Sequence, residues 1–200
     1  MTIRQKKREL RALARAKRAG AHRSVGSIGV RLADNFMDWA KKSLPMDRAV
    51  SGYHPIGNEA DVMPLLAALA KRGQPLCLPT TVGRDKPLIF RSWSPGEPLV
   101  SGAHDILEPA ESAPALDPDL LLIPLLAFDL AGGRLGYGAG HYDRTLAGLA
   151  DRPPLKVGVA YAGQRFDAVP MEETDQFLDA VLTEYGLAWF ERRGPATGIA

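Results

Sequence analysis

The sequence predicts an α/β fold: a single three-layer α/β/α domain in which helices cover both faces of a mainly parallel, Rossmann-like sheet. Three observations favour this class. Apolar strand-like runs alternate with segments of helical periodicity, without internal repeats. The run DLLLI at 119–123 has the length and continuous apolar character of a central parallel strand. Over 200 residues, 46% hydrophobic and 24% charged residues fit one globular core.

Three helices are expected in the first part of the chain. A basic helix over about 2–20 comes first, because alanine, leucine, lysine and arginine favour helix formation. A second helix at 25–43 has large apolar residues at helical steps and ends ahead of Pro45. A third, at 61–72, is stopped by Gly73.

The remaining elements are mainly strands. They are expected at 48–53, 76–78, 87–93, 119–123, 156–160, 177–183 and 187–190. A fourth helix can begin within 141–150, and residues 94–118 are expected to be mostly loop. The domain is predicted to span 1–192 and to be followed by a disordered tail at 193–200.

A glycine-rich segment, AFDLAGGRLGYGAGHYDR at 127–144, follows the 119–123 run. Its glycines permit positive φ and close backbone approach, so successive N–H groups can converge on an anion. Arg134 offers a planar fork suited to phosphate oxygens, and Asp143 offers a carboxylate for the magnesium ion of a nucleotide. The spacing matches neither the dinucleotide fingerprint nor the Walker A pattern. A long glycine-rich connection without a ligand is the alternative.

Positive charge is concentrated at the N-terminus. The net charge of the chain is +2, but residues 1–23 hold nine basic residues against Glu9, and the other 177 residues carry a net charge of −6. Three interpretations are open for the basic helix: a solvated face, a binding site for nucleic acid or a nucleoside triphosphate, and an organelle transit peptide.

Neither a membrane span nor a secretory signal is predicted. The sequence has no apolar run of 18 residues, and its N-terminus is charged. A cytoplasmic location is therefore expected. The single cysteine, Cys77, lies in an apolar run and is expected to be a buried, inert thiol.

A family resemblance rests on several segments in order. AFD followed by GGRLGYGAGHYDR resembles the signature of the 5-formyltetrahydrofolate cyclo-ligases, or methenyltetrahydrofolate synthetases, usually close to P-G-x-A-F-D-x-x-G-x-R-L-G-x-G-x-G-Y-Y-D-R. KRELR at 7–11, YHPIGNEAD at 53–61 and ILEP at 106–109 resemble further family segments. The C-terminal family pattern is matched by Gln164, Pro170, Asp175, Asp179, Thr183 and Glu184. Leu125 replaces the usual glycine of Pro-Gly, and His141 replaces the first tyrosine of Tyr-Tyr-Asp.

The resemblance implies an ATP-dependent cyclo-ligase that converts 5-formyltetrahydrofolate to 5,10-methenyltetrahydrofolate, releasing ADP and phosphate. In this family ATP phosphorylates the formyl oxygen, N10 attacks the activated carbon and phosphate departs. ATP is then the co-substrate and Mg²⁺ the metal. The expected partner is the folate alone, with or without a polyglutamate tail, and the protein is expected to be a monomer that binds neither membrane nor nucleic acid.

The same resemblance implies site residues. Lys7 and Arg134 are the catalytic candidates, and Asp143 and Asp175 are the magnesium ligands. The ATP site comprises Lys7, Arg8, Glu9, Leu10, Arg11, Arg134, Leu135, Gly136, Tyr137, Gly138, Ala139, Gly140, His141 and Tyr142. The folate site comprises His54, Glu59, Tyr137 and Tyr142.

Other interpretations of these residues are open. Asp175 is also suited to a turn, Glu59 to capping the next helix, and His54 to the end of a strand. The basic residues without a family counterpart, Arg15, Lys17, Arg18 and Arg23, are expected to form a solvated face. Two other classes of function remain: a catalytically lapsed relative that binds a nucleotide or RNA, and a sugar-phosphate isomerase or ligand sensor on a similar scaffold.

Overall fold

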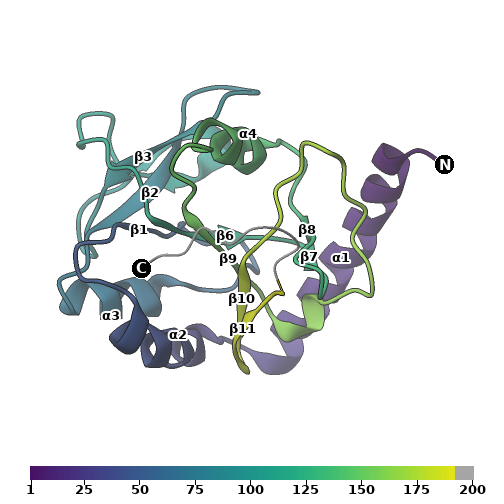
Figure 1. Cartoon of the computed structure of the whole chain (residues 1–200), viewed down its shortest axis with the longest axis horizontal. Coiled ribbons are helices and arrows are strands. Elements are labelled where there is room, and N and C mark those ends of the chain that lie inside the picture. The colour runs from purple at the N-terminus through teal and green to yellow at the C-terminus, as the bar shows by residue number, and fades with distance from the viewer. Residues whose placement is uncertain (192–200) are drawn as a thin grey trace.

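A seven-stranded mixed sheet forms the centre of the molecule (Figure 1). The computed structural model describes residues 1–191. The strand order is β11-β10-β9-β6-β1-β2-β3, with β10, β9, β6, β1 and β2 parallel and both edge strands antiparallel. The strands are β1 (Val50–Ser51), β2 (Leu76–Thr81), β3 (Leu88–Ser92), β6 (Leu120–Pro124), β9 (Leu155–Val159), β10 (Ala180–Thr183) and β11 (Gly186–Trp189). The predicted α/β class and mainly parallel sheet are confirmed.

Strand β6 explains why its sequence is apolar throughout. Leu120 and Leu122 point into the core beneath α2 (Gly29–Ser43) and α3 (Met63–Lys71). Leu121 and the residues on its side of the sheet pack instead against the face that carries α4 (His141–Gly148). Because successive strand side chains point to opposite faces, a strand covered on both sides must be apolar at every position.

A small hairpin lies within the glycine-rich segment. Strands β7 (Ala127–Phe128) and β8 (Arg134–Leu135) pair antiparallel, where the sequence predicted only a connection. Asp129 holds the turn together, because its carboxylate accepts hydrogen bonds from the backbone N–H groups of Ala131, Gly133 and Val169 at 2.7–2.9 Å. The Asp129 carboxylate is only 5% exposed, and its three charge-assisted hydrogen bonds fix the hairpin that precedes the remaining glycines of the segment.

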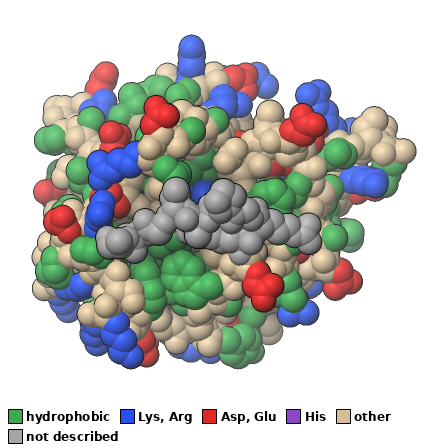
Figure 2. All heavy atoms as spheres, viewed as in Figure 1, with side chains coloured by type: hydrophobic (Ala, Val, Ile, Leu, Met, Phe, Trp, Pro, Cys, Tyr) green, Lys and Arg blue, Asp and Glu red, His purple; other side chains and the backbone are tan. Residues whose placement is uncertain are grey.

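Helix α1 (Ile3–Val25) packs against this hairpin (Figure 1). It continues past the predicted end near Gly20 and stops at Gly26, whose φ of 72° only glycine adopts readily. The second helix therefore begins at Gly29, not at residue 25. Basic and acidic side chains are interspersed on the face shown in Figure 2.

The predicted loop at 94–118 contains short elements: β4 (Val100–Ser101), η1 (Ala103–Asp105) and β5 (Leu107–Glu108). A further 3-10 turn, η2 (Ala162–Gln164), follows β9. The predicted tail at 193–200 lies outside the described residues, and the domain boundary at 192 stays a prediction. Within residues 1–191, no helix is both long and apolar enough to cross a membrane.

Candidate active site

Helix α1 directs Arg11 and Arg18 to the glycine-rich segment and Lys7 to the segment that follows η2. At 100° per residue, Arg11 and Arg18 lie about 40° and about 20° around the helix from Lys7, whereas Arg15 lies about 80° away. Lys7 and Arg18 are each 7% exposed. Arg15 is exposed. One side of the predicted basic face is therefore buried against the protein, and Arg15 points to solvent as expected.

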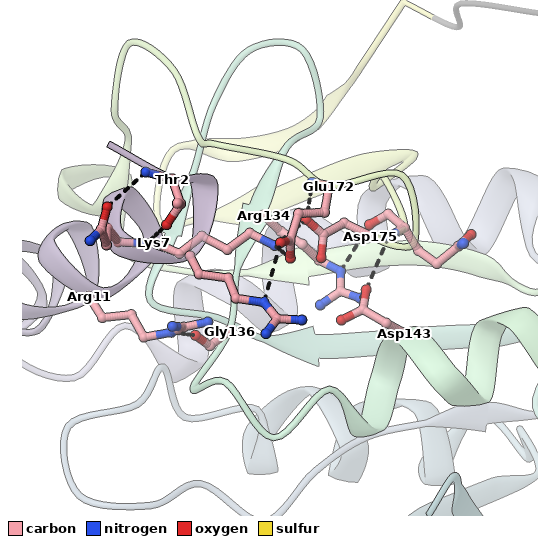
Figure 3. A network of polar contacts seen from close by, with 11 residues as sticks. Thr2, Lys7, Arg11, Arg134, Gly136, Asp143, Glu172 and Asp175 are labelled. Carbon is pink, nitrogen blue, oxygen red and sulfur yellow. Dashed lines mark hydrogen bonds and ion pairs between the residues drawn. The ribbon is translucent and has the colours of Figure 1, made fainter. Parts of the chain in front are cut away.

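Lys7 joins α1 to the segment that follows η2. Its Nζ lies 2.9 Å from Glu172 Oε2 and 2.5 Å from Asp175 Oδ2, and the second oxygen also accepts a 2.6 Å hydrogen bond from the Glu172 N–H (Figure 3). Burial works to lower the pKa of Lys7, but the hydrogen bonds and charges of the two carboxylates outweigh it and raise that pKa. Lys7 is therefore a fixed cation.

Arg134 makes the corresponding link from β8 to α4. Its Nη2 donates to Asp143 Oδ1 at 2.6 Å, and its Nε donates to the Gln176 carbonyl at 3.1 Å. Asp143 Oδ1 also accepts from the Gln176 N–H at 3.0 Å (Figure 3). The predicted magnesium carboxylates Asp143 and Asp175, 32 positions apart, thus belong to adjoining sets of contacts, because Asp143 bonds Gln176, the residue that follows Asp175. We call Lys7, Arg134, Asp143, Glu172 and Asp175 the Lys7 cluster.

A magnesium ion is compatible with this cluster on chemical grounds. Among the described residues, no three histidine, cysteine or acidic side chains are grouped closely enough to form a metal site by themselves. Magnesium, however, is commonly held by one or two carboxylates together with phosphate oxygens and waters. Asp143 and Asp175 provide two carboxylates, so the remaining ligands would have to come from a bound nucleotide and water.

The glycines after β8 differ in what they require. Gly138 has a φ of 107°, and a Cβ placed there would lie 3.1 Å from Arg11 Cζ. Gly140 has a φ of 68° and precedes the first turn of α4. At Gly136 a Cβ would meet no atom within 4 Å, and the carbonyl of this residue accepts a 3.0 Å hydrogen bond from Arg11 Nε. At Gly140 a Cβ would lie 2.9 Å from Arg144 Nη1, so Gly138 and Gly140 are the two positions where φ and space both favour glycine.

A second cluster surrounds Glu59, in the loop between β1 and α3. Glu59 is 6% exposed; its Oε2 accepts a 2.9 Å hydrogen bond from the Ile56 N–H, and its Oε1 accepts one from the Tyr137 hydroxyl. Arg18 Nη1 donates to the same hydroxyl and lies 3.8 Å from Glu59 Oε1. We call Arg18, Glu59 and Tyr137 the Glu59 cluster. Glu59 does not cap helix α3, because the N–H of its first residue, Met63, donates instead to Asp61 Oδ1 at 2.9 Å.

Burial dominates the electrostatics of Glu59. It raises the pKa of this carboxyl, although the hydrogen bonds from Tyr137 and Ile56 and the charge of Arg18 act in the opposite direction. Burial and the neighbouring carboxylate raise the pKa of Tyr137 as well. The phenol therefore stays protonated and donates a hydrogen bond to Glu59. Glu59 is thus a buried hydrogen-bond acceptor that is linked to the Arg18 guanidinium through the Tyr137 hydroxyl.

The other predicted site residues occupy varied environments. His54 is half-buried in the loop that carries Glu59. Tyr142, in the first turn of α4, is half-buried and packs against the core. His141 Nδ1 lies 2.8 Å from the Lys86 carbonyl oxygen. Of the remaining residues predicted to bind the nucleotide, Arg8, Glu9 and Ala139 are exposed. Leu135 is buried between α1 and the β7–β8 hairpin, and Leu10 packs against the same apolar group.

Sequence reasoning missed roles for three residues. Arg18 is buried, so its assignment to a solvated face was wrong; its position three helical turns from Lys7 was the available signal. Glu172 pairs with Lys7, and its place three residues before Asp175 was the only hint. Asp129 lies in the glycine-rich segment, but no pattern indicated that it binds three backbone N–H groups.

The departure at Leu125 has a packing explanation. Leu125 is 2% exposed, and its Cδ2 lies 2.7 Å from where a Cβ of Gly158 would be. Leu178 Cδ1 approaches the same point to 2.6 Å. Gly158, in the middle of β9, therefore leaves the space that the larger residue fills.

Comparison with known sequences gives consistent matches. A profile of the 5-formyltetrahydrofolate cyclo-ligase family matches residues 3–184. The 5-formyltetrahydrofolate cyclo-ligase of Escherichia coli (strain K12) is 34% identical over 146 residues, which cover 69% of this chain and 79% of that protein. The protein of the same name from Mycolicibacterium smegmatis is 33% identical over 159 residues, or 76% and 81% of the two chains.

Comparison with solved structures agrees. The structure of Aquifex aeolicus 5,10-methenyltetrahydrofolate synthetase aligns with a TM-score of 0.71 and 31% identity, covering 96% of this chain and 97% of that one. A 5,10-methenyltetrahydrofolate synthetase from Mycoplasma pneumoniae, 23% identical, shares the fold with a TM-score of 0.65. With the profile match over residues 3–184 and the ordered motifs, these similarities place the chain in the 5-formyltetrahydrofolate cyclo-ligase family.

Proposed function

We propose that this chain is an ATP-dependent cyclo-ligase that converts 5-formyltetrahydrofolate to 5,10-methenyltetrahydrofolate. Family membership supports the substrate and the reaction. The observation that carries the proposal is that α1 contacts two consecutive residues of the glycine-rich segment. Arg11 binds the Gly136 carbonyl on the side of the Lys7 cluster, and Arg18 binds Tyr137 in the Glu59 cluster. A phosphate donor and a folate would therefore meet at one segment.

The Lys7 cluster is proposed as the phosphate side. Lys7 and Arg11 supply positive charge one helical turn apart, and the backbone N–H groups near Gly138 and Gly140 lead into the N-terminus of α4, which favours anions. Magnesium, when bound through Asp143 and Asp175 with the nucleotide, would neutralise phosphate charge. Catalysis of phosphoryl transfer depends mainly on such positioning and charge stabilisation.

Arg134 has two tasks in this proposal. Its hydrogen bonds to Asp143 and to the Gln176 carbonyl hold β8, α4 and the Asp175 segment in register. Its planar guanidinium also provides donors suited to the oxygens of a transferred phosphoryl group. Lys7, now paired with Glu172 and Asp175, would turn part of its hydrogen-bonding capacity to phosphate.

The Glu59 cluster is proposed as the folate side. A carboxylate accepts hydrogen bonds well from the ring N–H and amino group of a pterin. Because Glu59 is largely removed from water, such bonds should favour a ligand that carries these donors. Tyr137, Tyr142 and His54 would line the same site. The formyl oxygen of the bound folate takes the γ-phosphoryl group as its bond to ADP breaks; N10 then attacks the formyl carbon and loses its proton, and the oxygen leaves with the phosphate. The carbon–oxygen bond broken is replaced by the new carbon–nitrogen bond.

We also propose that the protein acts in the cytoplasm as a monomer, on folates with or without a polyglutamate tail. The test of the function is absorbance of methenyltetrahydrofolate when purified protein is mixed with 5-formyltetrahydrofolate, ATP and Mg²⁺. We expect product only with all three present, and one ADP per product. Binding of ATP without any product would contradict the proposal and identify a catalytically lapsed relative.

A further inference from the structure

Arg18 is buried in the Glu59 cluster but belongs to none of the motifs that carry the family resemblance. Its side chain is 9% exposed and that of Glu59 is 3% exposed. The guanidinium carbon lies 5.4 Å from the centre of the Tyr137 ring, within the range of a cation–π contact. We propose that Arg18 is a positioning residue for the folate: it orients Tyr137 and keeps Glu59 aimed at the ligand. The inference rests on the proposed function.

The contacts form a relay in one direction. Arg18 Nη1 donates to the Tyr137 oxygen, and the Tyr137 hydroxyl then has its proton free to donate to Glu59 Oε1. Without the guanidinium, the phenol would be free to turn, because Tyr137 is 41% exposed and follows the unhindered Gly136. Glu59 Oε2 is held separately by the Ile56 N–H. Arg18 thus controls the oxygen of Glu59 that faces the glycine-rich segment.

A purely structural role explains the arrangement poorly. Burying an ion pair costs desolvation energy that the attraction often does not repay, so such a pair is weak evidence for stability. The Arg18 Nε is buried and has no hydrogen-bond partner within the described residues, which leaves one donor unused inside the proposed folate side. An unpaired buried donor indicates a missing acceptor. A folate polar group or a bridging water in the occupied site would satisfy it.

The charges around Glu59 make the proposal specific. The titratable groups that face this carboxylate are Tyr53 after β1, Tyr137, Tyr142 in α4 and Arg18 in α1. Arg18 is the cation of this set. Removing it should favour the protonated carboxyl, which accepts pterin donors less well. The acidic limb of folate binding should then move to higher pH.

The test compares Arg18→Met with Arg23→Met, which removes an exposed arginine from the last turns of the same helix. Calorimetric titrations measure 5-formyltetrahydrofolate and a non-hydrolysable ATP analogue separately, and thermal melts check folding. In Arg18→Met we expect the folate Kd to rise about tenfold, on the scale of a charge-assisted hydrogen bond, with the analogue Kd unchanged. Arg18→Lys should restore part of the affinity, and Arg23→Met should match the parent.

Tyr137→Phe provides the second arm if Arg18→Met unfolds. It removes the bridging hydroxyl from a half-exposed ring, so the fold should survive. We expect Tyr137→Phe to weaken folate binding, and the double variant with Arg18→Met to be no weaker than the worse single variant. A folate Kd for Arg18→Met equal to that of Arg23→Met, or fully additive effects, would overturn the inference. Absence of product from the parent protein would overturn the proposed function instead.

Discussion

The Lys7 cluster and the Glu59 cluster use the same helix in different ways. In the Lys7 cluster, two cations face three carboxylates, and a side chain such as Glu172 remains 34% exposed. In the Glu59 cluster, one carboxylate and one guanidinium, both under 10% exposed, share a phenol. A network with several exchangeable partners can accept a charged, metal-bound ligand. A buried acceptor with fixed neighbours instead selects a ligand by its hydrogen-bond pattern.

The largest effect is expected from Gly138→Val, which would separate the two clusters functionally. A valine must adopt a φ of 107° and displace Arg11, so the segment should distort where the phosphates are proposed to bind. We expect ATP-dependent turnover to be lost while folate binding persists. Steady-state kinetics and folate titration measure this. Gly148→Val is the control, because a Cβ there meets no atom within 4 Å. Unchanged ATP kinetics in Gly138→Val would contradict this role.

Arg134→Lys should have the next largest effect. The substitution keeps the charge but removes the fork that now binds Asp143 and the Gln176 carbonyl together. We expect kcat/KM to fall by an amount that corresponds to about 2 to 4 kcal/mol of lost transition-state stabilisation. This is the scale of losing one preorganised hydrogen-bond donor. The loss should appear mainly in kcat, with the folate Kd little changed. Turnover near that of the parent would assign Arg134 to packing alone.

Glu59→Gln should cost less and affect the other ligand. The amide keeps the shape, but it presents an N–H group where pterin donors need an acceptor, so folate binding should weaken by about 1 to 3 kcal/mol. ATP-analogue binding should be unchanged. Calorimetric titration of both ligands separates the two. A loss of thermal stability at full folate affinity would return Glu59 to a structural role.

The pH dependence of folate binding is a smaller and sharper test. Because burial raises the pKa of Glu59, its carboxylate should be protonated at a higher pH than that of an exposed glutamate. Folate affinity should therefore be present above that raised pKa and be lost as the pH falls through it. The glutamine of Glu59→Gln has no ionisable group, so the folate Kd of this variant should not show that loss of affinity at low pH. The same acidic limb in both proteins would show that another group titrates.

The sequence predicted the sheet better than the site, for physical reasons. The strand at 119–123 could be read because burial on both faces leaves a continuous apolar run, and Leu120–Pro124 lies within one residue of it. The helix boundary near Gly20 was wrong because glycine is tolerated inside an exposed helix, and φ at Gly26 is what ends it. Propensity alone does not distinguish these two glycines.

The charged residues show the limit more clearly. Lys7, Asp143 and Asp175 could be chosen from motifs, yet their joining through Glu172 and Gln176 depends on long-range packing. The burial of Arg18 likewise follows from how α1 lies on the hairpin. Local sequence carries the periodicity of a helix but not which neighbour will cover each of its sides.

The central claim is that α1 and the glycine-rich segment serve two ligands at two separable clusters. Its most direct test is a crossed titration of Arg11→Met, which changes the residue one helical turn from Lys7 on the proposed phosphate side, and Glu59→Gln. Each variant is titrated with an ATP analogue and with 5-formyltetrahydrofolate, in the absence of the other ligand. Arg11→Met should weaken the analogue and leave the folate Kd at the parent value, and Glu59→Gln should do the reverse. If both variants weaken the same ligand, or each weakens both equally, the division into two clusters is contradicted.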